Sequence, residues 1–82
     1  MMYSVYVIQS LKNGKRYVGF TADAVETRLQ EHHNGANQWT SQNGPFKIIH
    51  IEELPDRFSA VRREKFLKSG HGREVLKRFI PR

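Results

Sequence analysis

YSVYVIQ, at residues 3–9, is one of two stretches from which the fold can be predicted. The other is RYVGFT at residues 16–21. Both are rich in β-branched and aromatic residues, which favour β-strands. Between them lies Lys12-Asn13-Gly14-Lys15, and an Asn-Gly pair readily adopts the two positive φ values of a type I′ turn. The sequence therefore predicts two antiparallel strands that are joined by a tight hairpin.

A helix is predicted directly after this hairpin. Asp23 and Glu26 have the spacing of a capping box, which satisfies backbone N–H groups at the start of a helix. Asn34-Gly35 is a favoured end of a helix. We therefore expect a helix over residues 24–33, with its first turn capped by Asp23.

The second half of the chain adds one strand and two helices. The elements predicted there are a loop at residues 34–44, a strand at 46–52, a helix at 58–68, and a last helix that follows a break at 69–72 and ends near Phe79. A chain of 82 residues is too short for two independent cores. We therefore expect a single α+β domain over residues 1–82, with the order β-β-α-β-α-α. Its small three-stranded sheet, the N-terminal antiparallel hairpin plus one further strand, would be flanked by about three helices.

The charge of the chain is positive and unevenly distributed. Fourteen Lys and Arg residues stand against eight Asp and Glu residues, for a formal net charge of +6. Residues 57–82 contain nine of the basic residues and two of the acidic ones, a net charge of +7, so the first 56 residues sum to −1. This distribution favours a polyanionic partner, with nucleic acid as the first candidate and an anionic membrane surface as the second.

Cysteine is absent, and no apolar run is long enough to span a bilayer. The lack of cysteine excludes disulfides, thiolate metal sites and cysteine nucleophiles, and it fits a reducing cytoplasm. The first four residues also lack the basic start of a signal peptide. We therefore expect a cytoplasmic protein without membrane association.

Glu64 is a carboxylate in an apolar helix face that it shares with Ala60, Val61 and Leu67. Burial of a lone carboxylate is costly, so this group must be paired, protonated or bound to a cation. One interpretation is a structural ion pair with Arg28 or a nearby arginine. The other is a metal site, because one carboxylate with water and phosphate oxygens is enough for Mg²⁺. No second acidic residue stands where a two-metal site needs it, so any metal mechanism would use one ion.

Two tyrosines and an Arg–His pair are further candidates for a functional site. Near-equal arms of the hairpin bring Tyr6 and Tyr17 close together across the strands. Arg28 and His32, spaced i, i+4, are expected at the edge of the buried helix face. Each residue also has an ordinary interpretation: strand packing, a surface arginine, or a partly buried histidine. Gly19, inside the second strand, indicates a bulge or the close approach of another backbone.

The two strands resemble the signature of the GIY-YIG nuclease family. Ser4-Val5-Tyr6 corresponds to the first triplet of that signature and Tyr17-Val18-Gly19 to the second. Ser4 replaces the glycine of the first triplet and valine replaces isoleucine in both, which are small changes for strand packing. The resemblance extends from Tyr3 to Phe79, and the build is that of small stand-alone bacterial members. More distantly, the chain is similar to the N-terminal nuclease domain of the excision-repair incision subunit.

The resemblance implies roles for five catalytic residues, which are Tyr6, Tyr17, Arg28, His32 and Glu64. Glu64 would hold a single Mg²⁺ or Mn²⁺ ion, and Arg28 would neutralise phosphate charge. Tyr17 would accept a proton from the attacking water, with Tyr6 and His32 orienting or assisting it. The choice between the two phenols as the base stays open.

The implied function is that of a metal-dependent endonuclease that hydrolyses phosphodiester bonds in DNA. It would be directed by the structure of the DNA rather than by its sequence, as in DNA repair or recombination. The residues expected to follow the nucleic-acid backbone are Arg62, Arg63, Lys65, Lys68, Arg73 and Lys77. The alternative is a nucleic-acid-binding module on the same scaffold with weak or no cleavage activity.

Several expectations concern partners and missing groups. DNA is the expected partner, with RNA as a second candidate, and a targeting protein could add specificity. No small-molecule organic cofactor is expected.

Larger members of the family carry a late asparagine near the site, whereas no asparagine follows Glu64 here, and Lys68 could supply a positive charge instead. Trp39, in the predicted loop, would either stack on a base or cover the core.

Overall fold

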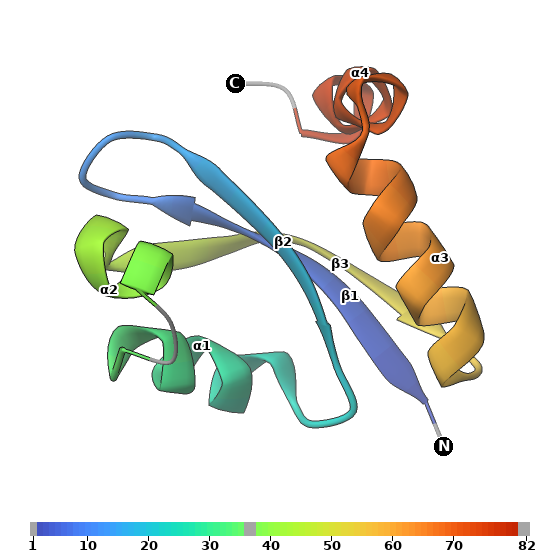
Figure 1. The fold of residues 1–82 in the computed structure, drawn as a ribbon, viewed down its shortest axis with the longest axis horizontal. Helices are drawn as coiled ribbons and strands as arrows, with labels where there is room; N and C mark the ends of the chain where they lie inside the picture. Colours follow the sequence, from blue (N-terminus) through green and yellow to red (C-terminus); the bar gives the residue numbers. More distant parts are fainter. Residues whose placement is uncertain (1, 36–37, 81–82) are drawn as a thin grey trace.

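The central strand of the sheet comes first in the chain. The computed structural model describes residues 2–35 and 38–80, and at residues 38 and 39 only the backbone. In chain order, the elements are β1 (Tyr3–Ser10), β2 (Arg16–Thr21), α1 (Val25–His33), α2 (Gln38–Asn43), β3 (Phe46–Leu54), α3 (Arg57–Lys68) and α4 (Gly70–Phe79). The strands are antiparallel and lie in the order β2-β1-β3 (Figure 1). This confirms the predicted α+β fold and its order of strands and longer helices.

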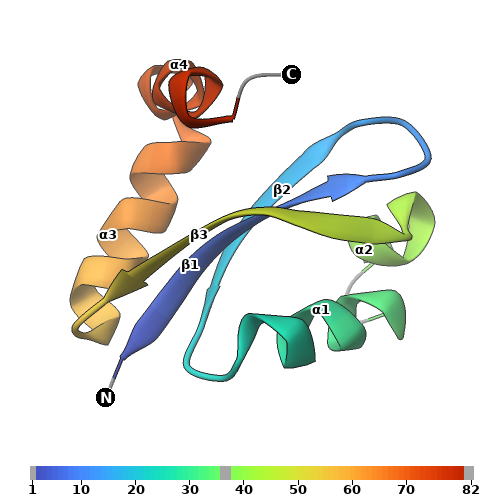
Figure 2. The same cartoon turned by 180° about the vertical axis from the view of Figure 1, so that it is seen from behind.

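Each face of the sheet is covered by a pair of helices, as Figures 1 and 2 show from opposite sides. Val5 and Val7 of β1 pack with buried residues of α3 and α4, which are Ala60, Leu67 and Leu76. Tyr6 and Ile8, which point to the other face, pack with Val25 of α1 and Phe46 of β3. Because both faces are covered, the four consecutive residues 5–8 of β1 are buried, and this run is apolar rather than alternating.

The prediction of a loop at residues 34–44 is wrong over its second half, because α2 lies there. The described part of the chain thus has four helices rather than about three. Thr40 is 1% exposed and anchors α2 to the protein, but a threonine is not an apolar side chain that reveals a helix by its period. The side chain of Trp39 lies outside the described residues, and so does its expected role.

The hairpin is confirmed, but its tight type I′ turn is wrong. The connection runs over the five residues between Ser10 and Arg16, and among the described residues only glycines, including Gly14 at +78°, have positive φ. The hydroxyl of Ser10 accepts hydrogen bonds from the backbone N–H groups of Lys12 (3.0 Å) and Asn13 (3.1 Å). A serine that bonds the following backbone favours this wider turn over the two-residue one.

The capping predicted for α1 is also wrong. Ala24 occupies the cap position and has no side-chain capping bond. The backbone N–H of Asp23 donates instead to the hydroxyl of Thr21 at 3.0 Å, so a turn stabilised by Thr21 leads into the helix. The predicted end is confirmed: Asn34 caps the helix, and Gly35 follows with a φ of +83°.

The last two helices meet at Ser69, so the predicted break at residues 69–72 shrinks to one residue. The hydroxyl of Ser69 accepts a hydrogen bond from the backbone N–H of Gly72 at 3.1 Å and caps α4. A Cβ atom at Gly72 would overlap the backbone carbonyl of Phe66, so a glycine is required where the helices cross. No helix in residues 2–35 or 38–80 is long and apolar enough to cross a membrane.

Candidate active site

The two tyrosines lie side by side because a glycine stands between them. Tyr6 pairs with Gly19 across the hairpin and Tyr17 pairs with Ile8, so the tyrosines are diagonal neighbours on one face of the sheet. A Cβ atom at Gly19 would lie 2.5 Å from the hydroxyl of Tyr6 and 3.2 Å from Cε1 of Tyr17. The glycine therefore makes room for side chains rather than for a second backbone or a bulge.

His32 is the buried centre of the site, whereas the sequence predicted it at the edge of the helix face. It is 0% exposed. Its Nε2 lies 2.8 Å from the hydroxyl of Tyr6, and the Tyr17 ring meets it edge-on, with 5.0 Å between the centroids. The two tyrosines thus cover a histidine that the helix alone would leave half exposed.

Burial decides the charge of His32. Loss of water lowers the pKa of the imidazole, and the positive charge of Arg28 lowers it further, so the ring is neutral near pH 7. Neutral imidazole has one donor and one acceptor nitrogen. Nε2 is shared with Tyr6, while Nδ1 is buried without a hydrogen-bond partner among the described residues.

Arg28 and Tyr6 affect each other. Burial raises the pKa of the Tyr6 phenol above 10.0, and a hydrogen bond and the charge of Arg28 offset part of that rise. Tyr6 therefore keeps its proton as a neutral donor at ordinary pH. The Arg28 guanidinium is also held by Glu31 at 2.8 Å, an i, i+3 pair that the sequence contains and that our sequence analysis missed.

Glu64 reaches the same place from the other face of the sheet. Its carboxylate is 18% exposed and pairs with Nζ of Lys68 at 3.2 Å rather than with an arginine. The same Nζ atom lies 5.8 Å from the centroid of the Tyr17 ring. Glu64 is also among the charges that act on the Tyr6 phenol. The first interpretation of Glu64 is thus wrong about the partner: the carboxylate is in an ion pair, but with a lysine one turn away on the same helix.

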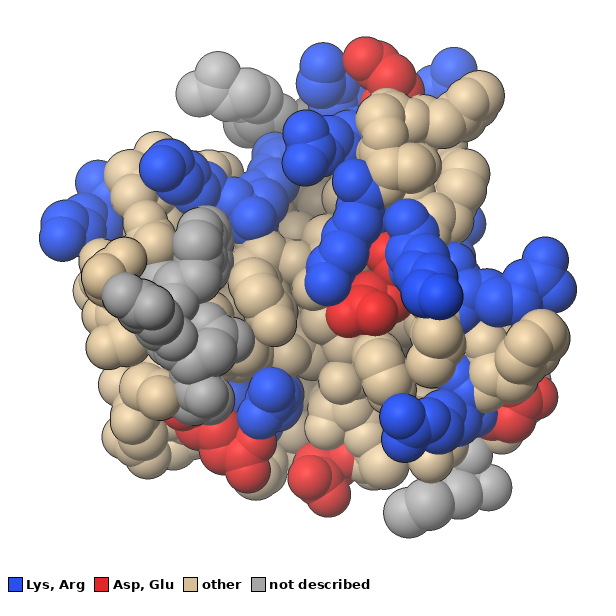
Figure 3. All heavy atoms as spheres, in the orientation of Figure 1, with Lys and Arg blue, Asp and Glu red and all other residues tan. Residues whose placement is uncertain are grey.

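The structure brings all five predicted residues together at the outer edge of β2, where α1 and α3 approach from opposite faces (Figure 1). His32 contacts both tyrosines, Tyr17 lies near Lys68, and Lys68 pairs with Glu64. Arg28 joins this group through its hydrogen bond with Tyr6. On this face, an acidic group lies between basic side chains where the sheet meets α3 (Figure 3).

Glu64 is the carboxylate that could hold a metal ion in this site. No group of three or more His, Asp or Glu residues is placed to do so in the described ranges 2–35 and 38–80. A single, partly exposed carboxylate does not fit an ion that needs a full set of protein ligands. It does fit Mg²⁺ or Mn²⁺, which can keep bound water and use phosphate oxygens as further ligands.

The basic residues predicted to bind nucleic acid lie in two different places. Lys68, Arg73 and Lys77 line a hollow beside the site, together with Arg16 of β2, which our sequence analysis missed. Lys65 is exposed on α3, and the Arg62 guanidinium lies 5.5 Å from the ring centroid of Phe58.

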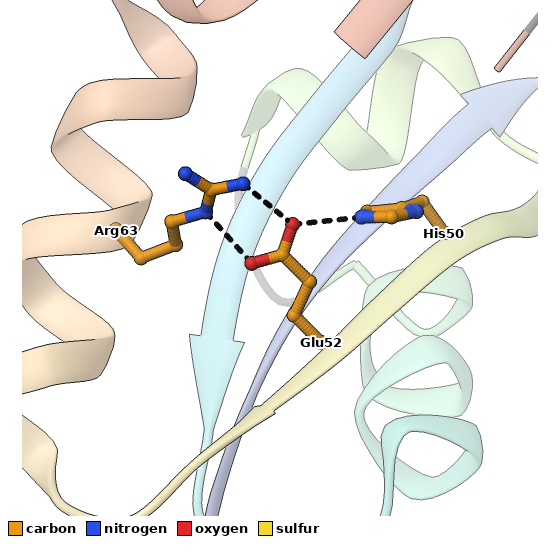
Figure 4. Close-up of polar contacts among 3 residues, drawn as sticks. All are labelled: His50, Glu52 and Arg63. Atoms are coloured by element: carbon orange, nitrogen blue, oxygen red, sulfur yellow. Dashed lines mark hydrogen bonds and ion pairs between the residues drawn. The ribbon is translucent and has the colours of Figure 1, made fainter. Parts of the chain in front are cut away.

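Arg63 is committed to another contact. Its Nε and Nη2 donate to the two carboxylate oxygens of Glu52 at 2.7 and 3.0 Å, and His50 lies 2.8 Å from the same carboxylate (Figure 4). This pair joins α3 to β3, on the far side of β1 from the site. We therefore propose no phosphate contact for Arg63.

Comparison with known proteins agrees with this geometry. The sequence model of the GIY-YIG catalytic domain matches residues 2–77, and the chain therefore belongs to the GIY-YIG family. UPF0213 protein BH0048 of Halalkalibacterium halodurans is 32% identical over 69 residues, which cover 83% of this chain and 71% of that protein. UPF0213 protein VNG_2274C of Halobacterium salinarum is 35% identical over 68 residues, 82% of this chain and 86% of that protein.

A solved structure supports the fold. The solution NMR structure of UPF0213 protein BH0048, given there as from Bacillus halodurans, is similar to this chain with a TM-score of 0.59 and 30% identity. The match covers 96% of this chain and 85% of that one. These relatives are small stand-alone members of the family, as the sequence predicted.

Proposed function

We propose that the protein is an endonuclease that hydrolyses phosphodiester bonds in DNA with the help of one divalent metal ion. The observation that carries this proposal is the meeting of two phenols, Arg28, Lys68 and a single carboxylate at the edge of β2. Phosphodiester hydrolysis requires an activated water, stabilisation of the negative charge on the phosphate, and assistance to the leaving oxygen. The site contains a residue suited to each task.

Arg28 and Lys68 are suited to the phosphate charge. The guanidinium of Arg28 can donate in a fixed fork to phosphate oxygens, and Glu31 and Tyr6 hold it in place. Lys68 supplies a point charge one helical turn beyond Glu64 and could take the place of the late asparagine of larger family members. Glu64 would hold Mg²⁺ or Mn²⁺, and a bound ion of this kind supplies a Lewis acid for the phosphate and leaving oxygens.

The two phenols have different surroundings, which favours Tyr17 as the proton acceptor. Tyr6 is buried, and its raised pKa keeps it protonated, so it has no free phenolate to accept a proton. Tyr17 is less buried than Tyr6, and the Lys68 ammonium lies 5.8 Å from its ring centroid. Tyr6 and His32 would then keep Tyr17 and Arg28 in position.

The expected substrate is DNA selected by its structure. Lys68, Arg73 and Lys77 would contact phosphates, which carry no sequence information. Selection would then rest on the shape of a repair or recombination substrate, or on a targeting protein. We expect such an enzyme to act in the cytoplasm.

A second candidate function has a specific observation in its favour. The carboxylate of Glu64 is already paired with Lys68, and a metal ion would have to compete with that ammonium. If the ion pair prevails, the protein would bind nucleic acid on the same surface and cleave it weakly or not at all.

A cleavage assay separates the two functions. Plasmid DNA and branched oligonucleotides are incubated with the protein, with and without Mg²⁺ or Mn²⁺, and Glu64→Ala is compared with Glu53→Ala, which removes an exposed carboxylate from β3. We expect metal-dependent cleavage that is lost in Glu64→Ala and retained in Glu53→Ala. Cleavage that is unchanged in Glu64→Ala would contradict the assignment of the site. Salt-sensitive DNA binding without cleavage by the native protein would establish the second function.

A further inference from the structure

Next to the candidate active site lies a hollow whose interior has no part in the proposed chemistry. It is bounded by β2, α3 and α4 and has a volume of about 640 Å³, within the range of pockets that hold small organic molecules. Tyr17 and Lys68 belong both to its wall and to the site. Anything bound in the hollow would therefore lie directly beside the phosphate at which hydrolysis is proposed.

The hollow combines apolar surface with a basic rim. Val18, Leu67 and Leu76 lie at its base but are only 8%, 0% and 3% exposed, so the apolar surface open to a ligand comes mainly from the Tyr17 ring and the hydrocarbon stems of the basic side chains. Its rim carries four basic residues, Arg16, Lys68, Arg73 and Lys77, and the residues that line it include no acid. Figure 3 shows basic side chains on this face from the hairpin end of the sheet towards α4. The basic groups thus favour an anion, while the Tyr17 ring and the hydrocarbon stems favour an apolar group attached to it.

A DNA duplex does not have this combination on its outside. It presents phosphates and sugars to a protein surface, and the faces of its bases are stacked inside. An unstacked nucleotide does combine the two, because its base has an apolar face and its phosphates are anionic. An aromatic ring, here Tyr17, is also a common surface for stacking such a base.

We propose that this hollow binds one unstacked nucleotide of a DNA strand, next to the phosphate in the active site. The base would lie against Tyr17 and the hydrocarbon stems of the rim, and the basic groups of the rim would hold its phosphates. A second hollow shares Gly14, Arg16 and Lys77 with the first and extends it towards the hairpin loop, which provides a path for the strand beyond that nucleotide. This inference rests on the proposed function only in requiring that the same face binds DNA.

The test is a binding experiment without divalent metal, so that it does not depend on cleavage. Three duplexes are compared by fluorescence anisotropy: one with a single bulged 2-aminopurine nucleotide, one with an abasic residue at the bulge, and one fully paired. We expect the bulged base to improve affinity at least about fivefold over the abasic bulge, which corresponds to the ~1 kcal/mol lower limit for a stacked base. We also expect the 2-aminopurine fluorescence to change on binding.

Two neighbouring residues of α4 provide matched variants. Lys77 lines both hollows, whereas Arg78 is exposed and lines neither. Lys77→Glu should remove the preference for the bulged base, while Arg78→Glu, with the same change in charge, should weaken all three duplexes alike and leave the preference intact. Loss of the preference in both variants would contradict the assignment of the hollow.

The outcomes separate this inference from the proposed function. Equal affinity for the bulged base and the abasic bulge would overturn the inference and leave a DNA-binding nuclease site untouched. An absence of binding to any of the three duplexes at low salt would overturn the proposed function, and the inference with it.

Discussion

Gly19 sets the geometry of the candidate site at the scale of a single residue. The hydroxyl of Tyr6 crosses β2 at the place where any other residue would have its Cβ atom. This position allows Tyr6 to reach His32 and Arg28 from the central strand. The missing Cβ atom at Gly19 thus allows the Tyr6 hydroxyl of β1 to meet the polar side chains of α1 at the edge of β2.

Gly19→Ala should disrupt both stability and activity. The new methyl group would displace Tyr6 from His32, and overpacking of this kind costs about 1–3 kcal/mol. Misplacement of the site should also lower cleavage on the order of tenfold to a hundredfold. The measurements are urea unfolding and the cleavage rate. Gly70→Ala is the control, because a Cβ atom there meets nothing within 4 Å, and it should change stability by less than about 1 kcal/mol. Equal effects of the two substitutions would contradict the role of Gly19.

His32 should make the stability depend on pH. Because burial lowers the pKa of His32 in the folded protein, the unfolded chain binds more protons at mildly acidic pH. The free energy of unfolding should therefore fall as the pH decreases below 6.5, the ordinary pKa of histidine. The pKa values of Glu52, lowered by Arg63, and Asp56, lowered by hydrogen bonds from Ser59, affect stability only below their ordinary values of 4.5 and 3.8.

Urea unfolding between pH 7 and pH 5 tests this prediction. His32→Gln should flatten the decline in stability, since the buried titrating group is gone. His71→Gln, at an exposed position, should leave the decline as it is. A steep decline in His32→Gln would show that another group is responsible.

At the scale of elements, α3 is attached to the sheet on two sides. Glu64 and Lys68 extend towards Tyr17 at the edge of β2. Arg63 extends to Glu52 of β3, at the opposite edge of the sheet. The ion pair with β3 thus fixes the orientation of the helix that carries the metal-binding candidate.

Arg63→Met should loosen this attachment. Glu52, whose side chain is 20% exposed, would lose both guanidinium hydrogen bonds. For a partly exposed pair of this kind we expect a loss of about 1–2 kcal/mol in the free energy of unfolding. Arg62→Met, at the adjacent and exposed position, should stay within about 0.5 kcal/mol of the native protein. If the two variants are equally stable, the ion pair with Glu52 does not hold α3.

At the scale of the whole molecule, the position of the positive charge determines how DNA binding should respond to salt. Four basic side chains, Arg16, Lys68, Arg73 and Lys77, surround the hollow beside the site. If each neutralises one phosphate, the logarithm of the binding constant should fall with the logarithm of salt concentration with a slope of roughly −3 to −4. Arg73→Ala should reduce that slope by about 1, while Lys47→Ala, on β3, should not change it. A slope near zero for the native protein would contradict the proposed interface.

Local patterns in the sequence were enough to predict the strands, the longer helices and the residues of the candidate site. β-branched residues and the Asn34-Gly35 stop are local signals, and they act over a few neighbouring residues. The order and spacing of Tyr6, Tyr17, Arg28, His32 and Glu64 were likewise visible along the chain. Local signals failed where a polar side chain holds the local structure in place, as Ser10 does in the hairpin turn and Thr40 does in α2.

The charge state, the partners and the surroundings of the candidate site residues depend on the tertiary structure. Burial of His32 depends on two tyrosines from two different strands, β1 and β2. The pairing of Arg63 with Glu52 depends on how α3 lies across the sheet. The hollow beside Tyr17 likewise exists because β2, α3 and α4 meet there. Such properties arise from distances between elements far apart in the chain, and no local pattern of residues encodes those distances.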